Sequence, residues 1–70
     1  MSIYKLSGFV GKSYFNSKKN FRTRDEAISY AFAHMLPSNV QLVEEIFKTK
    51  HDVEYVCEDQ IRFFISRHTI

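Results

Sequence analysis

A single helical segment with a clear start and a clear end is the feature that most constrains this chain. Thr23 precedes Glu26 by three residues, the spacing of a capping box. In that motif the hydroxyl accepts from the Glu26 backbone N–H, and the carboxylate accepts from the Thr23 N–H. Pro37 disfavours helical backbone at the residue before it and so ends the run. The sequence therefore predicts one helix over residues 24–35.

Apolar side chains inside this segment recur at steps of three and four, which places them on one face of a helix. Asp25 and Glu26 fall in the first turn, where the helix dipole favours negative charge. We expect the apolar face to pack against a sheet. That face comprises Ala27, Ile28, Ala31, Phe32, Met35 and Leu36.

The N-terminal part of the chain alternates with the two-residue period of a strand over residues 3–9. A turn at residues 10–13, loosened by glycine, leads to a second, short strand that begins at Tyr14 and Phe15. The alternation assigns Tyr4, Leu6 and Gly8 to one face, and Ile3, Lys5, Ser7 and Phe9 to the other, as in a strand with one wetter side.

The C-terminal part reads as a hairpin of residues 53–57 and 61–65. A three-residue loop at residues 58–60 pairs Tyr55 with Phe63 and makes every cross-strand pair on that face apolar. The other face is mixed and is either solvated or a binding surface. It carries Glu54, Val56, Arg62 and Phe64.

Residues 40–50 fit neither clean alternation nor a clean helical stripe. Ser38 or Asn39 can cap a second helix there. The frequent β-branched residues favour instead a strand with a bulge near Glu44 and Glu45. We therefore expect a single α+β domain over residues 1–70, with one helix packed on an antiparallel sheet of about four or five strands in the order β-β-α-β-β-β.

Charge is divided along the chain, although the formal net charge is only +2. Residues 1–24 hold six lysines and arginines and no acid, whereas residues 25–59 hold all eight acids. This asymmetry indicates either an acidic or polyanionic partner, or a fold in which the two halves neutralise each other. The candidate residues for binding a partner or nucleic acid are Lys12, Tyr14, Lys18, Lys19, Arg22 and Arg24.

Residues with catalytic or metal-binding chemistry are few and scattered. The three histidines and Cys57 lack the spacing of a compact ligand pair, so the sequence predicts no catalytic residue, no metal and no cofactor. A lone cysteine forms no intramolecular disulfide, and we expect Cys57 to be a buried, inert thiol in the reducing cytoplasm. No stretch approaches the roughly 20 apolar residues of a membrane span, so we expect no membrane partner.

These patterns are typical of a binding protein. We expect a non-catalytic protein-binding module that uses the basic region of residues 12–24 on a protein partner of acidic character. The alternative is a protein that binds single-stranded or double-stranded nucleic acid, because single-strand binders combine stacking rings with cationic side chains. A further alternative is a structural homodimer through a sheet edge or an aromatic face, since seven Phe and four Tyr are many for so small a core.

Two resemblances to known proteins add to this interpretation. The segment Thr23-Arg24-Asp25-Glu26-Ala27, followed by Ala31 and Pro37, resembles the strand-helix-strand of the small RNA-polymerase inhibitor of T7-like bacteriophages. Tyr4-Lys5-Leu6-Ser7-Gly8-Phe9 and Val53-Glu54-Tyr55-Val56-Cys57 look like segments of short phage and prophage proteins of Gram-positive bacteria. The second resemblance implies a phage or prophage genetic setting and no activity. We expect the binding module to be a phage accessory protein that binds and modulates a host protein.

Overall fold

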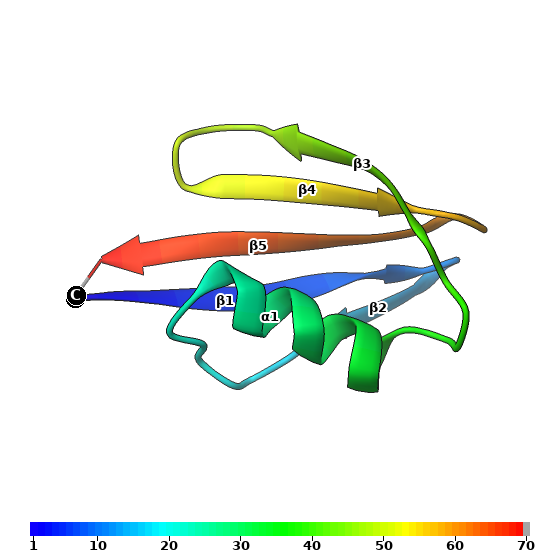
Figure 1. Ribbon diagram of the computed structural model, residues 1–70, viewed down its shortest axis with the longest axis horizontal. Coiled ribbons are helices and arrows are strands. Elements are labelled where there is room, and N and C mark those ends of the chain that lie inside the picture. The colour runs from blue at the N-terminus through cyan, green and yellow to red at the C-terminus, as the bar shows by residue number, and fades with distance from the viewer. Residues whose placement is uncertain (70) are drawn as a thin grey trace.

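The computed structural model describes residues 1–69. In it, one helical segment packs on a five-stranded antiparallel sheet (Figure 1). The strands lie side by side in the order β2-β1-β5-β4-β3. The predicted α+β class and the predicted element order are confirmed. The elements are β1 (Ser2–Val10), β2 (Ser13–Asn16), α1 (Arg24–Tyr30), η1 (Ala31–Met35), β3 (Leu42–Phe47), β4 (Asp52–Cys57) and β5 (Ile61–Thr69).

The centre of the sheet is a pairing between the first strand and the last. β1 and β5 are antiparallel from the pair Ser2 and Thr69 to the pair Val10 and Ile61. The β1–β2 hairpin therefore adds to one side of β5, and the β3–β4 hairpin adds to the other. Helix α1 lies across one face of this sheet, and the connection from η1 to β3 crosses at the end of the molecule near the β1–β2 turn (Figure 1).

The start of the helix follows the predicted cap, with one correction. The Thr23 hydroxyl accepts from the Glu26 backbone N–H at 3.1 Å. The Glu26 carboxylate does not return to Thr23 as predicted but accepts from the Arg22 N–H at 3.4 Å. Thr23 is extended (φ −134°, ψ 159°), as is usual for an N-cap residue. The Glu26 carboxylate thus bonds to the amide one residue before the predicted one.

The end of the helix also differs in detail from the single regular helix predicted over residues 24–35. α1 is regular to Tyr30, and the next five residues form the wider, π-helical turn η1. The Leu36 N–H donates to the Ala31 carbonyl five residues back, at 3.0 Å. Leu36 itself is extended, as the residue before Pro37 should be.

The core lies between the helix and one face of the sheet. The ring of Tyr55 stacks on Phe63, with centroids 4.9 Å apart and planes 12° from parallel. Gly8 leaves room for Phe15, because a Cβ at Gly8 would lie 2.7 Å from the Phe15 ring and 2.5 Å from the Arg62 carbonyl oxygen. The buried apolar residues are Leu6, Phe21, Ala27, Ala31, Leu36, Val53, Tyr55, Cys57, Ile61, Phe63 and Ile65.

β3 and the β4–β5 turn have the geometry that the apolar pattern favoured. Residues 42–47 form a strand and not the alternative helix, and their register with β4 shifts between Leu42 and Glu44, which is the expected bulge. The β4–β5 hairpin pairs Tyr55 with Phe63, as predicted. Its turn has no glycine, and Asp59 and Gln60 take positive φ angles of 57° and 61°.

Candidate functional site

The sheet face opposite the helix carries aromatic and charged side chains. Side chains alternate between the faces of a strand, so residues adjacent to the buried ones point away from α1. On this uncovered face, Phe9 of β1 stands opposite Tyr14 of β2 and opposite Arg62 of β5. Three neighbouring strands thus contribute to one surface, which the connecting helix does not cover.

Three rings and one guanidinium meet on this face. The Phe9 centroid lies 5.3 Å from that of Tyr14 and 6.3 Å from that of Phe64, both in edge-to-face geometry. The Arg62 guanidinium lies over the Phe9 ring at 5.2 Å. Tyr14 remains 59% exposed, whereas Phe9 and Phe64 are half-buried. We call Lys5, Phe9, Tyr14, Arg62 and Phe64 the aromatic-cation surface.

The charges of the uncovered face are divided between its two halves. Lys5 and Arg62 are exposed on the half formed by β2, β1 and β5. Glu44 and Glu54 lie on the half formed by β3 and β4, where Lys48 makes an ion pair of 3.2 Å with the buried Glu54. Consequently one half offers rings with cations, and the other offers the exposed Glu44 carboxylate beside the Lys48–Glu54 ion pair.

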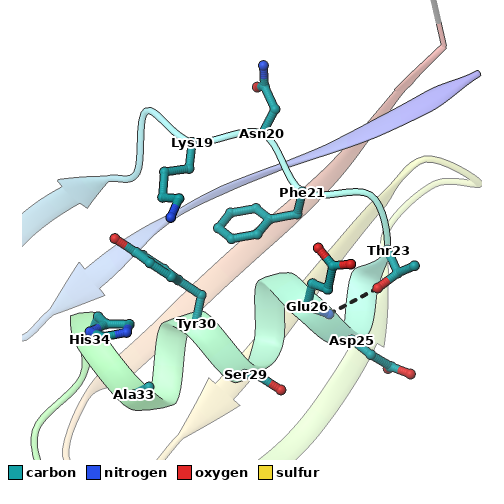
Figure 2. Close-up of a pocket in the computed structure, with 10 residues that line it drawn as sticks. All are labelled: Lys19, Asn20, Phe21, Thr23, Asp25, Glu26, Ser29, Tyr30, Ala33 and His34. Carbon is teal, nitrogen blue, oxygen red and sulfur yellow. Dashed lines mark hydrogen bonds between the residues drawn. The ribbon is translucent and has the colours of Figure 1, made fainter.

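A second candidate lies on the helix side of the molecule. A groove of about 570 Å³ lies between α1 and the loop that precedes it, and Figure 2 shows the residues that line it. Tyr30 forms its centre, with the Lys19 ammonium 5.0 Å from its centroid and the rings of His34 and Phe21 at 4.7 and 5.2 Å. Glu26 lies nearer the cap, so this groove has a cationic and an acidic end.

The structure separates the residues that the sequence suggested as one binding region. Lys12 and Tyr14 belong to the β1–β2 hairpin, with Lys12 in its turn. Lys18 and Lys19 lie in the loop after β2. At the start of the helix, the Arg22 N–H bonds to Glu26 and the Arg24 guanidinium lies over the Phe47 ring at 5.6 Å.

Only Tyr14 of those six candidates is part of the aromatic-cation surface. Phe9, Arg62 and Phe64 were not among them, although the alternation on residues 3–9 and 61–65 had placed them on polar or mixed faces. Their convergence depends on the pairing of β1 with β5, which no local pattern announces.

Metal-ligating side chains do not cluster in the part of the chain that the structure describes. Among residues 1–69, no three histidine, cysteine, aspartate or glutamate side chains are arranged to hold a metal ion. Cys57 is buried, and burial, assisted by the Glu58 carboxylate, raises the pKa of its thiol. The thiolate, which is the nucleophilic form, is therefore disfavoured.

Comparison with known proteins assigns this chain to no family, so its function is inferred from the geometry. No family model, no curated protein and no solved structure matches this chain. Within residues 1–69, neither helical segment has the length and apolarity needed to cross a membrane.

Proposed function

We propose that this protein is a non-catalytic binding module whose aromatic-cation surface docks on an acidic region of a partner protein. The observation that carries the proposal is the exposed Tyr14 ring held edge-on by Phe9, beside the exposed cations Lys5 and Arg62. Tyrosine and arginine are the residue types that most often dominate protein interfaces. The resemblance to phage proteins supports a host protein as the partner, and the single buried Cys57 supports a cytoplasmic setting.

The arrangement of the rings favours a protein over a nucleic acid. Stacking of successive bases requires several free ring faces. Here Arg62 covers a face of Phe9, and Phe9 meets both other rings edge to face, so Tyr14 alone is largely exposed. The exposed Glu44 carboxylate on β3 would also repel a polyanion that extended across the sheet.

Affinity capture from nuclease-treated host extract tests this proposal with matched variants. We expect a protein that the unaltered chain retains to be lost with Tyr14→Ala and with Arg62→Glu. It should still be captured by Lys50→Glu, which reverses an exposed charge in the β3–β4 turn. Equal capture by all four proteins would contradict the assignment of the surface.

A triple charge reversal at Lys18, Lys19 and Arg22 separates this surface from the basic region first suggested by the sequence. We expect the triple variant to capture the same protein as the unaltered chain. Loss of capture in that variant alone would move the interface to the helix side of the molecule.

Single-stranded nucleic acid is the second candidate, favoured by the interleaving of rings and cations on one face. Titration against labelled single and double strands at two salt concentrations decides it. Affinity that falls steeply with salt, through release of condensed counterions, would support nucleic acid. The proposed protein interface predicts no binding to either strand at low salt.

A further inference from the structure

β3 is an edge strand with an unusual amount of exposed apolar surface. β4 lies on one side of it, and no strand in residues 1–69 lies on the other. Val43 and Phe47 are 67% and 62% exposed, and Leu42 is also exposed. Edge strands of this kind are templates for pairing with another chain unless lysine, proline or a bulge blocks them. The bulge at Leu42 and Glu44 disturbs only the beginning of β3.

The backbone groups that face the free edge can be assigned from the β3–β4 hairpin. The Lys48 N–H donates to the Asp52 carbonyl at 3.0 Å, so the backbone N–H and C=O groups of Lys48 point toward β4. Successive residues of an antiparallel strand direct their N–H and C=O groups to alternate sides. The backbone groups of Ile46 therefore also point toward β4, while those of Glu45 and Phe47 point toward the free edge.

Symmetry limits how two copies of this edge can pair. An antiparallel pair of identical strands is related by a two-fold axis perpendicular to the sheet, and the residue beside the axis stands opposite its own copy. An axis at Glu44 or Glu45 would place two identical carboxylates directly opposite each other, which is destabilising. An axis at Phe47 would pair Glu45 with Thr49, whose N–H is already bonded to the Asp52 carbonyl at 3.2 Å.

An axis at Ile46 avoids both problems and matches charges. On the uncovered face, Glu44 then stands opposite the partner's Lys48. On the helix face, Glu45 stands opposite the partner's Phe47, whose ring lies under the Arg24 guanidinium at 5.6 Å. Glu44 thus meets a cation of the second copy, and Glu45 meets a ring that already carries a guanidinium on its face. Glu45 and Phe47 direct their backbone N–H and C=O groups to the free edge. With this axis each of them stands opposite the other residue of the second copy, so backbone hydrogen bonds form between the two strands.

We propose that two copies of this chain pair through β3, antiparallel, about a two-fold axis at Ile46. The five-stranded sheet of each copy then continues into that of the other. The two Phe47 rings become diagonal neighbours on the helix face, within reach of each other at about 7–8 Å between backbones. This interface is separate from the aromatic-cation surface, which remains free in both copies.

Disulfide trapping tests the register. Opposite residues of a pair that exchanges no hydrogen bonds have Cα atoms about 4.5 Å apart, within the range of a disulfide. Ile46 forms such a pair with its copy. We expect Ile46→Cys to give a covalent dimer on mild oxidation, seen by non-reducing electrophoresis. Glu44→Cys and Glu45→Cys should not, and neither should the unaltered chain, whose Cys57 is buried.

Light scattering and sedimentation test the dimer without a new cysteine. The unaltered chain and Glu44→Asp should show twice the monomer mass. Glu44→Lys, at an exposed position, should raise the dissociation constant about tenfold or more, because two attractions become repulsions. A monomer mass for the unaltered chain, unchanged association of Glu44→Lys, or equal trapping at all three cysteine positions would each overturn the proposal.

Discussion

At the scale of single residues, the packing of the sheet depends on one position without a side chain. Gly8 sits on the buried face of β1, opposite Phe15 of β2 and Phe63 of β5. A Cβ there would lie 2.5 Å from the Arg62 carbonyl oxygen and 2.8 Å from the Phe63 Cα atom. Both are backbone atoms of the central strand, which can give way only if the β1–β5 pairing shifts.

We expect Gly8→Ala to lower the free energy of unfolding by about 1–3 kcal/mol, the usual cost of overpacking a core. Urea denaturation followed by circular dichroism measures the change. Ser7→Ala is the matched control, because Ser7 is the neighbouring residue on the uncovered face of β1. A Gly8→Ala protein as stable as the control would show that the contacts with Phe15 and Arg62 are not tight.

At the scale of elements, α1 is short and therefore depends strongly on its N-terminal cap. α1 has seven residues before the chain widens into η1, and a helix this short is marginal on its own. The Thr23 hydroxyl satisfies the Glu26 N–H, and the Glu26 carboxylate satisfies the Arg22 N–H. Two backbone donors at the helix start are therefore satisfied by side chains, while Ala27 anchors its buried side.

Thr23→Ala removes the capping oxygen and should lower the free energy of unfolding by about 1 kcal/mol. Thr23→Ser keeps the oxygen and should restore most of that loss. Thermal and urea denaturation of the three proteins check the result. A serine variant as unstable as the alanine variant would assign the effect to the lost methyl group and not to the cap.

Elements with local signals could be predicted from the sequence, and those that need distant partners could not. The helix start at Thr23, its end before Pro37 and the pairing of Tyr55 with Phe63 all follow from patterns within a few residues. The wider turn after Tyr30 has no such pattern. The bond from the Arg22 N–H depends on the path of the chain before the cap, which the capping-box spacing does not specify.

The candidate site shows the same limit. The basic run of the first third suggested one surface, but the β1–β2 turn and the start of α1 lie at opposite ends of the molecule (Figure 1). Lys12 is thereby separated from Arg22 and Arg24. The aromatic-cation surface instead joins residues of β1 and β5, more than fifty positions apart in the chain. Strand order had to be known before these residues could be grouped.

At the scale of the whole molecule, two buried acidic groups make the free energy of unfolding depend on pH in the alkaline range. They are the Tyr55 hydroxyl and the Cys57 thiol. Burial raises the pKa of the Tyr55 hydroxyl, and the Glu45 carboxylate raises it further. Burial also raises the pKa of the Cys57 thiol. Both groups therefore lose their protons more readily in the unfolded chain than in the folded one. Among residues 1–69 no group donates a hydrogen bond to the Tyr55 oxygen that would stabilise the phenolate and offset this rise.

Because both pKa values are raised on folding, their contribution to stability is present in full below the ordinary pKa of each group. It is lost progressively as the pH rises from that value through the raised pKa of the folded protein. We expect the free energy of unfolding to fall above about pH 8.5, the ordinary thiol value, and further above about pH 10. Denaturation curves at a series of pH values measure this. Tyr55→Phe should flatten the upper part of the decline and Cys57→Ala the lower part; an unchanged slope in both would refute the linkage.

The central position of β5 also has a consequence for the newly made chain. Of the five strands in residues 1–69, β5 is the last to leave the ribosome, yet it alone among them touches both hairpins. Until it emerges, the β1–β2 and β3–β4 hairpins have no shared neighbour, and isolated hairpins are at best marginally stable in water. We therefore expect the sheet to assemble only after residues 61–69 arrive and join the two halves.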